Sequence, residues 1–508
     1  MAALAVAFKR AGFSVSGSDS EKIFPPMSTH LKKSGIKYNL GFAEKNIQKP
    51  DEVVVGNAHV NSLNPEIIAA KKKGISLIHF PRLVEKYLIQ KNSVVVAGTY
   101  GKTTTTAMVA WILEKCGWKS NFMLGGIPLN FGNGARLIKS NWSVVEGDEY
   151  PAAAPWDKAP KFKYYHPRFL ILTSAEWDHM DVYKTKESYL TEFKKLVASV
   201  PRDGIIVAKL GGENLNNVLK EAKCKVVYYS NQKSEIRNQV DPLRSDKKSD
   251  RLPLIKGEMS GAPLLYKEVV GGGKSTTVYF VDAVKVRENK TEFEIKKYYM
   301  RLSASRPPLG LPLLKGEIMK VGGFETKLLG EFNLENWCAA VALVSELKMP
   351  LPKIQAGVKS FSGVKRRLEI RGVKKGVTVI DDFAHNPSKA RQSVLALRRH
   401  FPQSKIFVIF EPNRGGRSEK CLTGYDHVFV GVNKIFIPEL TNYPPKNGVV
   451  DVSGKELAEY LKKTHAGVAY ESSVAKLVAW LKKNAQKGDV IAFLGSRNFG
   501  GAIERIIS

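Results

Sequence analysis

The sequence predicts an α/β protein of three domains, each built around a mostly parallel sheet. Its 508 residues exceed the roughly 250 to 300 residues at which one hydrophobic core stops growing. Short runs rich in β-branched residues alternate with helical stretches, which is typical of parallel strands joined by crossover helices. The runs fall into three series, and the breaks between them predict domains at residues 1–90, 91–349 and 350–508.

Each series contains several strand-like runs. The first has FSVSGS, DEVVVGN and SLIHF beside the helical stretch PEIIAAKKKG, and the second continues from SVVVAG through WSVVEGDE to PRFLILTSAE. The third has VTVIDDFAH, KIFVIFEP and DVIAFLGS. Runs of the second series end in polar residues or glycine, which is where ligands bind in open parallel sheets.

The middle domain contains a stretch of different character at about residues 231–323, rich in Lys, Ser, Pro and Gly. RLPLIKGEM at 251–259 and GLPLLKGEI at 310–318 are near copies, but a single pair of copies is not a solenoid. We interpret both copies as inserted surface loops. They flank TTVYFVDAVKV and TEFEIKKYYM, which predict a β-hairpin.

The composition indicates a soluble globular protein of the cytoplasm, because 43% of the residues are hydrophobic and 25% are charged. No apolar run reaches the roughly 18 residues that a membrane helix needs. The start MAALAVAF is interrupted by Lys9 and Arg10 and lacks the charge pattern of a signal peptide. The four cysteines lie far apart without a CxxC pair, which argues against a disulfide framework and a cysteine-rich zinc site.

The formal net charge of +31 has two explanations, an anionic polymer partner or a basic bias spread over the surface. The densest basic runs are KKKG at 71–74 and GVKRR before Leu368. Neither is interleaved with aromatic residues, as a groove for single strands would be. We therefore expect a diffuse basic surface and no nucleic-acid partner. A nucleic-acid-dependent P-loop ATPase remains the remote alternative.

The strongest local signal is VVVAGTYGKTTTTAMVAWILEKCG, where an apolar strand leads into a glycine turn and a helix. Backbone N–H groups in such a turn point at phosphates, a following lysine reaches the terminal phosphates, and a following threonine can bind magnesium. The full Walker spacing fails, because Val96 stands where its first glycine belongs. The residues expected to contact ATP here are Gly98, Thr99, Gly101, Lys102, Thr103 and Thr104.

Acidic residues follow the next strand-like run of this domain. Glu146 ends WSVVE, and we expect it to bind Mg²⁺ because hard oxygen ligands at the carboxyl edge of a sheet suit that ion. For Asp148 and Glu149, a solvated loop is an equally good interpretation. The run FLILTSAEWDHMD then ends in Asp178, His179 and Asp181, where we expect contact with metal or phosphate.

Several of these segments resemble the Mur ligases and occur in the order of that family: AGTYGKTTTT, VVEGDEY, AEWDHMDVY, LGEFNLENWCAA, GVKRRLEIRG and VIDDFAHNPSKA. The resemblance implies a Rossmann-like amino-terminal domain for a uridine nucleotide, a central P-loop ATPase, and a Rossmann-like carboxy-terminal domain that delivers a peptide. It implies ATP and Mg²⁺ as cofactors. It also implies an ATP-dependent amide ligase of cell-wall synthesis.

Further segments resemble one branch of the family: FPPMSTHLKKSGI, VGNAHVNSLNPEI, GGIPLNFGNGARL, FEPNRGGRS and SRNFGGAIERI. This branch joins the recycled tripeptide L-alanyl-γ-D-glutamyl-meso-diaminopimelate to UDP-N-acetylmuramate through an acyl phosphate. The branch that adds free L-alanine to the same sugar nucleotide is the near alternative. We expect small-molecule substrates, no membrane partner, and a monomer or weak dimer.

The resemblance also implies roles for single residues. Lys102 would hold the γ-phosphate, Thr103 and Glu146 would bind one magnesium ion, and His179 would bind a second. Asn336 would bind adenine, and Arg367, Asp382 and His385 of the third domain would close on the nucleotide, which makes Lys102, His179, Arg367 and His385 the expected catalytic residues. The expected substrate-binding residues are Asp19, Asn130, Arg414 and Arg417, although solvated arginines are an equally good interpretation of the last two.

The sequence departs from the family at three places. Tyr100 replaces the usual His or Asn of the phosphate loop, and Phe332 replaces the usual His of the adenine motif. The family opens with a strand and a glycine-rich turn, and Met1 coincides with the methionine of that turn. Because the loss of a central strand would leave sheet edges unpaired, we expect translation to begin upstream.

Overall fold

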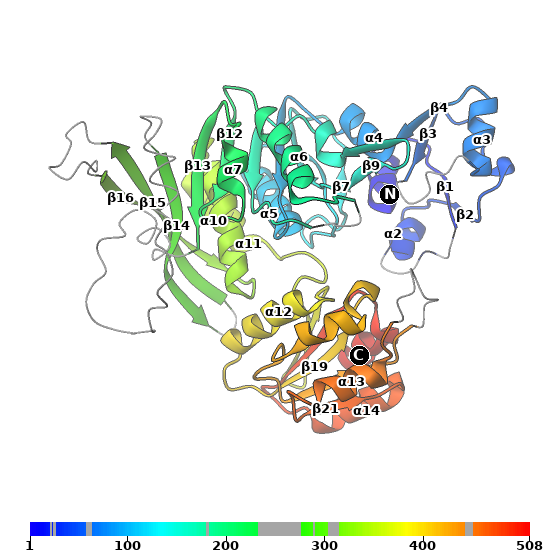
Figure 1. Ribbon diagram of the computed structural model, residues 1–508, viewed down its shortest axis with the longest axis vertical. Coiled ribbons are helices and arrows are strands. Elements are labelled where there is room, and N and C mark those ends of the chain that lie inside the picture. Colours follow the sequence, from blue (N-terminus) through cyan, green and yellow to red (C-terminus); the bar gives the residue numbers. More distant parts are fainter. Residues whose placement is uncertain are drawn as a thin grey trace. The chain divides into compact units, whose positions relative to one another are not determined.

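The computed structural model describes residues 1–20, 23, 27–56, 63–178, 182–231, 276–287, 290–302, 314–441 and 451–508 (Figure 1). The chain forms two compact units. Unit 1 comprises residues 1–284, 292–326 and 334–361, and unit 2 comprises residues 285–291, 327–333 and 362–508.

The first ninety residues contain two small parallel sheets, β1–β2 and β3–β4, and belong to unit 1. Leu4 and Phe8 of the first helix pack into the same core as strand β5 of the central sheet. Parallel pairing agrees with the prediction, but the strands do not join into one sheet. The elements are α1 (Ala2–Arg10), β1 (Gly17–Asp19), α2 (Met27–Lys33), β2 (Tyr38–Leu40), η1 (Glu44–Asn46), β3 (Glu52–Val55), α3 (Pro65–Lys72), β4 (Ser76–His79) and α4 (Phe80–Tyr87).

The centre of unit 1 is a ten-stranded sheet in the order β16-β15-β14-β13-β12-β11-β5-β8-β6-β7. Its strands are β5 (Asn92–Ala97), β6 (Asn121–Met123), β7 (Ala135–Arg136), β8 (Trp142–Gly147), β11 (Phe169–Leu172), β12 (Ile205–Lys209), β13 (Lys225–Ser230), β14 (Thr276–Arg287), β15 (Lys290–Leu302) and β16 (Leu314–Thr326). The pairs from β6 through β8, β5, β11, β12 and β13 to β14 are parallel, and β6–β7 is antiparallel. The central strands are buried on both faces, which explains why they read as continuous apolar runs.

Helices and a small hairpin complete unit 1. They are α5 (Lys102–Lys115), the hairpin of β9 (Pro151–Ala153) and β10 (Asp157–Pro160), η3 (Lys161–Tyr164), α6 (Lys186–Ala198), α7 (Leu215–Leu219), α10 (Glu331–Glu346) and α11 (Leu351–Ser360). The sequence predicts that residues 351–360 belong to the third domain. Helix α11 instead belongs to unit 1, where Ile112 of α5 packs against Gly357.

The inserted stretch of the middle domain is only partly described. As expected, β14 and β15 are neighbours in the sheet, and Figure 1 shows them with β16 at one end of it. The first repeat, 251–259, lies outside the described residues. The loop interpretation is wrong for the end of the second repeat, because residues 314–318 begin strand β16.

Unit 2 contains a six-stranded sheet in the order β17-β18-β22-β19-β20-β21, parallel except for β17–β18. Its elements are β17 (Glu369–Lys374), β18 (Val377–Asp382), α12 (Pro387–His400), β19 (Ile406–Glu411), η4 (Arg414–Gly416), η5 (Glu419–Tyr425), β20 (Lys434–Ile437), α13 (Gly454–Leu461), β21 (Val468–Tyr470), α14 (Val474–Asn484), β22 (Val490–Gly495), η6 (Phe499–Gly501) and α15 (Ala502–Ile507).

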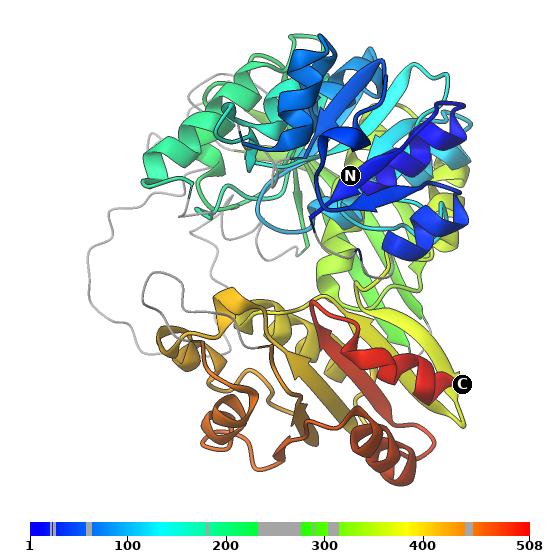
Figure 2. The same ribbon diagram turned by 90° about the vertical axis from the view of Figure 1, so that its right-hand side faces the viewer.

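Two separate cores show that helices cover both faces of this sheet. Leu397 of α12 and Leu461 of α13 belong to one core, and Leu481 of α14 and Ile503 of α15 belong to the other. Figure 2 shows the helices of unit 2, in yellow to red, on the two sides of its sheet. This is the doubly wound arrangement, in which ligands bind beyond the carboxyl ends of the strands. The predicted α/β class is confirmed for both units.

Two findings bear on the expectations from composition. Within the ranges described, no helix has the length and apolar character needed to cross a bilayer. All four cysteines are free thiols; Cys116 and Cys338 are buried, and Cys224 and Cys421 are half-buried.

Candidate functional site

The glycine turn lies between the end of β5 and the start of α5, as the sequence predicted. Gly98 and Gly101 have φ values of 123° and 76°, which side chains rarely adopt. A Cβ on Gly98 would lie 2.3 Å from Oγ1 of Thr173, and a Cβ on Gly101 would lie 2.5 Å from Oδ1 of Asn336. Both positions therefore require glycine.

The end of strand β11 holds the turn from the side. The backbone N–H of Thr99 donates to Oγ of Ser174 at 3.1 Å, and the Thr99 hydroxyl donates to the carbonyl oxygen of Glu176 at 2.9 Å. Because β5 and β11 are parallel neighbours, their carboxyl ends lie side by side. The structure thus fixes the turn through residues that the sequence analysis did not single out.

Lys102 is the first residue of α5, and its side chain folds back over the turn. Nζ donates to the carbonyl oxygen of Gly98 at 2.5 Å and contacts the two carboxylate oxygens of Glu149 at 3.1 and 3.0 Å. Burial lowers the pKa of Lys102, but the carboxylates of Glu149 and Glu146 outweigh it and raise the pKa above its ordinary value. Lys102 is therefore a permanent cation at the start of the helix.

Thr103 and Glu146 meet at the adjoining strand end, as predicted. The Thr103 hydroxyl donates to Oε1 of Glu146 at 2.9 Å, and the backbone N–H of Gly125 donates to Oε2 at 2.7 Å. The pairing of Val96 with Glu146 in strands β5 and β8 sets this approach. Thr104, in the same helical turn, is half-buried.

The Thr103 and Glu146 oxygens fit a magnesium ion. Magnesium is usually held by one or two carboxylates together with phosphate oxygens and water, rather than by a cage of protein ligands. Among the residues that the structure describes, no cluster of three or more His, Cys, Asp or Glu side chains could hold a metal by itself. Two hard oxygen donors beside the glycine turn are therefore compatible with the predicted magnesium site.

The solvated-loop interpretation is wrong for Glu149, which is 1% exposed. Its partner is Lys102, so this carboxylate faces the glycine turn and not solvent. Asp148 pairs instead with Lys161 at 2.5 Å and accepts the N–H of Tyr150 at 3.0 Å. Burial raises the pKa of Asp148, but Lys161 outweighs it, and the pKa lies below its ordinary value.

Of the other residues predicted for the nucleotide and metal in unit 1, the structure places Asn336 but not His179. Asn336 on α10 lies against Gly101, so its amide is beside the phosphate turn. His179 and Asp181 lie outside the described residues. Asp178 is described, but the second metal position predicted for His179 remains a prediction.

The expected residues for the UDP part and the sugar lie apart from the phosphate turn in the sequence. Asp19 ends strand β1, where its carbonyl oxygen accepts the N–H of Gly41 at 2.7 Å. Asn130 donates through Nδ2 to the carbonyl oxygen of Ser360 at 2.9 Å, at the end of helix α11. Their roles as substrate ligands remain predictions.

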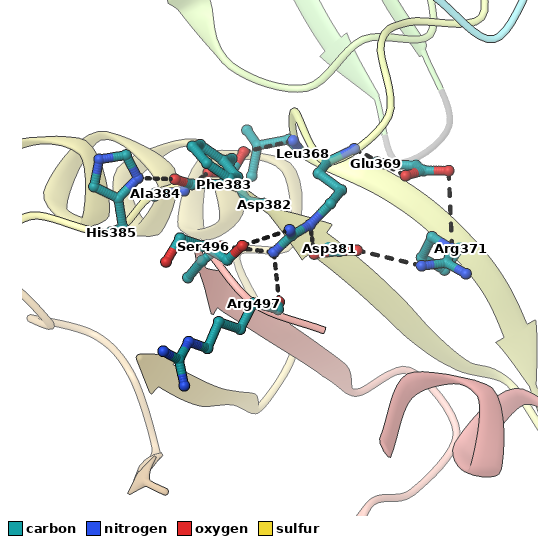
Figure 3. A network of polar contacts seen from close by, with 12 residues as sticks. Leu368, Glu369, Arg371, Asp381, Asp382, Phe383, Ala384, His385, Ser496 and Arg497 are labelled. Carbon is teal, nitrogen blue, oxygen red and sulfur yellow. Dashed lines mark hydrogen bonds and ion pairs between the residues drawn. The ribbon is translucent and has the colours of Figure 1, made fainter. Parts of the chain in front are cut away.

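In unit 2, the predicted residues Asp382 and His385 lie at the carboxyl end of β18 (Figure 3), and Arg367 lies near them, beside Phe383. The buried carboxylate of Asp382 accepts the backbone N–H groups of Leu368 at 2.6 Å and Ala384 at 2.7 Å. Burial raises the pKa of Asp382 above its ordinary value although these donors oppose it. Arg367 is exposed, and its Cζ lies 5.7 Å from the centre of the Phe383 ring. Asp382 thus joins two loops, while Arg367 extends to solvent.

His385 is positioned by the start of helix α12. The Asn386 side chain caps that helix by accepting the N–H of Lys389, and Pro387 occupies the first helical position. Nδ1 of His385 lies 2.7 Å from the carbonyl oxygen of Phe383. This contact requires a proton on Nδ1, which leaves Nε2 as the acceptor of the neutral ring.

Burial, with smaller contributions from Lys389 and Arg367, lowers the pKa of His385 from 6.5 to about 4. Between these pH values the unfolded chain binds a proton that the folded chain does not, so stability is lost as pH falls from 6.5 toward 4. We expect the His385→Asn variant to lose less stability than the parent over this window. Denaturant unfolding at several pH values measures the difference. Identical pH slopes would contradict the low pKa.

Arg366 was not predicted, although it stands beside Arg367 in the same basic doublet. Its guanidinium donates to the carbonyl oxygens of Gly495 at 2.6 Å, Ser496 at 2.9 Å and Arg497 at 2.7 Å, and to Asp381 at 3.2 Å. Figure 3 shows this network, which ties the loop after β22 to the end of β18. The doublets RR and DD were the only signal in the sequence, and each doublet supplies one residue to the network.

Arg414 and Arg417 both pair with Asp451. Arg417 donates to Asp451 at 3.2 Å and to the carbonyl oxygen of Thr441 at 2.8 Å, and its side chain is 3% exposed. The solvated interpretation is therefore wrong for Arg417. Arg414 approaches the same carboxylate at 3.2 Å and is 32% exposed.

Comparisons with known proteins identify the family of this chain. The Mur ligase family catalytic domain matches residues 1–92, the Mur ligase middle domain matches residues 157–260, and the Mur ligase glutamate ligase domain matches residues 366–497. Together the matches span more than half of the chain, and the chain belongs to the Mur ligase family. Members of this family are ATP-dependent ligases that form carbon–nitrogen bonds in peptidoglycan synthesis.

Two curated relatives match nearly the full length. The UDP-N-acetylmuramate–L-alanyl-γ-D-glutamyl-meso-2,6-diaminoheptandioate ligase of Escherichia coli K12 is 29% identical over 511 residues, covering 100% of this chain and 95% of the relative. The UDP-N-acetylmuramate–L-alanine ligase of Acetivibrio thermocellus is 26% identical over 502 residues, covering 98% and 91%. In fold, the chain is similar to the UDP-N-acetylmuramate–alanine ligase of Thermotoga maritima, with a TM-score of 0.71, 21% identity, and coverage of 100% and 95%.

Proposed function

We propose that this protein joins L-alanyl-γ-D-glutamyl-meso-diaminopimelate to the carboxylate of UDP-N-acetylmuramate, with ATP converted to ADP and phosphate. The observation that carries the proposal is the 29% identity to the tripeptide ligase over the whole chain. The L-alanine ligase is the second candidate, because it is 26% identical over nearly the same length. The two candidates differ only in the amine that is joined.

Two arginine side chains at the carboxyl edge of the unit 2 sheet support a peptide substrate that carries several carboxylates. Arg414 is 32% exposed and Arg497 is 43% exposed, at the ends of β19 and β22 respectively. Guanidinium groups recognise carboxylates through paired hydrogen bonds. The tripeptide carries several carboxylates and free L-alanine carries one, so two partly exposed arginines would suit the tripeptide if its carboxylates replaced their present partners, Asp451 and Glu411.

The reaction needs an activated carboxylate, because an amine does not displace oxide from a carboxylate. In the proposed first step, an oxygen of the sugar carboxylate attacks the γ-phosphorus of ATP, the bond to ADP breaks, and an acyl phosphate forms. In the second step, the peptide amine attacks the acyl carbon, and phosphate leaves from a tetrahedral intermediate. Holding the reactants in line supplies much of the acceleration in such reactions.

The residues around the glycine turn would serve the first step. Lys102 would offset the charge of the moving phosphoryl group, and the N–H groups of the turn would hold the adjoining phosphates. Thr103 and Glu146 would hold the magnesium ion, which when bound neutralises phosphate charge. In unit 2, the neutral imidazole of His385 offers Nε2 as a hydrogen-bond acceptor; its pKa of about 4 makes it a weak base.

An acceptor panel tests the proposal. Phosphate release is measured with ATP, Mg²⁺ and UDP-N-acetylmuramate in the presence of the tripeptide, free L-alanine or no amine. We expect the tripeptide to exceed L-alanine in kcat/KM by at least about tenfold, since each charged contact is worth about that factor. A preference for L-alanine would establish the second candidate. ATP binding without phosphate release under every condition would mean a non-catalytic scaffold.

Two additions to the panel separate the remaining alternatives. Single-stranded nucleic acid replaces the amine in one reaction, and stimulation there would indicate a nucleic-acid-dependent ATPase instead. Mass spectrometry of the tripeptide reaction identifies the product. A product mass other than that of the amide-linked UDP-sugar peptide would contradict the proposed bond.

A further inference from the structure

Three carboxylates follow one another after strand β8, and each has a different partner. Glu146 accepts the hydroxyl of the first turn of α5. Asp148 pairs with Lys161. Glu149 pairs with Lys102, the lysine proposed to bind the phosphates of ATP. Of these three carboxylates, Glu149 is the one that hydrogen-bonds to the Lys102 ammonium, while Glu146 and Asp148 act on it through charge at longer range.

The Glu149 carboxylate is held in a buried position. Its backbone carbonyl oxygen accepts the hydroxyl of Tyr183 at 2.5 Å, and the Tyr183 ring packs edge-on against Tyr189 with centroids 5.2 Å apart. Tyr183 is 7% exposed, and Tyr189 is fully buried. A buried carboxylate is stable only when a cation or several donors face it, and Lys102 lies within 3.1 Å of both its oxygens.

The ammonium of Lys102 already makes close contacts. An ammonium group has three N–H donors, and Nζ faces the Gly98 carbonyl oxygen and both Glu149 oxygens. These contacts fix the side chain over the turn, so it does not have to be ordered when phosphates arrive. They also mean that a phosphate approaching Nζ must displace, or share, its contact with the Glu149 carboxylate.

We propose that Glu149 is a positioning residue that acts through Lys102, orienting the ammonium over the phosphate turn and competing with nucleotide phosphates for it. The inference rests on the proposed function, because it requires that Lys102 bind a nucleotide. Glu149 thereby sets how tightly the site holds nucleotide. An unopposed lysine would bind ADP more tightly and release it more slowly after the reaction.

The test compares the ADP affinity of the parent protein with that of Glu149→Gln in the presence of Mg²⁺, by calorimetric titration. The amide keeps the size and removes the charge, and we expect ADP to bind about tenfold more tightly, as for the loss of one competing charged hydrogen bond. Asp148→Asn is the matched control, since it removes a nearby charge whose partner is Lys161. We expect the control to change the affinity less than Glu149→Gln does.

A double-substitution cycle tests whether Lys102 carries the effect. Glu149→Gln should leave ADP affinity unchanged in a Lys102→Ala background. A tenfold gain that persists there would overturn the proposal, as would equal or weaker ADP binding by folded Glu149→Gln. Glu149→Asp keeps the charge but moves it away by one methylene, so it should increase ADP affinity less than Glu149→Gln does. This variant replaces Glu149→Gln in the test if the Gln variant does not fold. A parent protein that binds no ADP would instead refute the proposed function.

Discussion

Lys102→Ala is expected to lower phosphate release by about 10²- to 10³-fold, because the transferring phosphoryl group loses a preorganised cation. The effect should fall mainly on kcat, since charge builds on this group as the phosphoryl moves. The measurement is phosphate release with saturating ATP, sugar nucleotide and tripeptide. Because the variant also removes the cation that faces the buried Glu149 carboxylate, we expect some loss of stability, and turnover is compared on protein whose circular dichroism matches that of the parent.

Lys115→Ala is the matched control for Lys102→Ala. Lys115 lies in the last turn of the same helix, and its Nζ is 4.6 Å from the centre of the Trp111 ring. It is exposed and does not contact the turn. We expect turnover close to that of the parent protein. A Lys102→Ala variant as active as this control would refute the role proposed for Lys102.

Glu146→Gln is expected to lower turnover by about 10²-fold at limiting Mg²⁺ and to recover part of it at high Mg²⁺. The amide keeps an oxygen for the Thr103 hydroxyl but removes the negative charge that a hard cation needs. Phosphate release measured across a Mg²⁺ titration separates metal binding from chemistry. The half-saturating Mg²⁺ concentration should rise in the variant.

Glu114→Gln provides the comparison for Glu146→Gln. Glu114 lies near the end of α5 and pairs with Arg136 at 2.8 Å, so its loss removes the same charge from another ion pair of unit 1. Its Mg²⁺ dependence should match that of the parent protein. If Glu146→Gln and Glu114→Gln gave superimposable Mg²⁺ titrations, Glu146 would not be a metal ligand.

The glycine turn between strand β5 and helix α5 could be predicted from the sequence because its determinants are local. A strand, two glycines, a lysine and a threonine follow one another within residues 92–103, and glycine is the residue that tolerates the required φ values. The approach of Glu146 also followed from a simple rule. Carboxyl ends of neighbouring parallel strands share one edge of the sheet, and β5 and β8 are neighbours.

The partners of charged side chains could not be predicted, because they depend on residues distant in sequence. From the sequence alone, Glu149 looks like a solvated loop residue. Its partner Lys102 is 47 residues away in the sequence, and only the fold brings the two side chains into contact. Arg417 reads as a surface arginine until Asp451 is placed beside it. The sequence supplies the charge, and only the fold decides whether that charge meets water or an opposite charge.

The boundary of the third domain was misplaced for a similar reason. A break near residue 350 is visible in the sequence, but helix α11 after it packs on α5 of the preceding unit. The residues 314–318 were misread because Leu, Lys, Gly and Pro in a repeated segment suggest a loop. Tertiary pairing in a sheet overrides such a weak local preference.

The Arg366 network makes two loops of unit 2 mechanically dependent on each other. One planar guanidinium is bound to three successive carbonyl oxygens on one side and to the carboxylate of Asp381 on the other. A ligand that displaced Ser496 would therefore disturb the hydrogen bonds of the Arg366 guanidinium, whose backbone adjoins Arg367. The loop after β22 and the segment that carries Arg366 would thus respond together at one carboxyl edge of the sheet, through a single side chain.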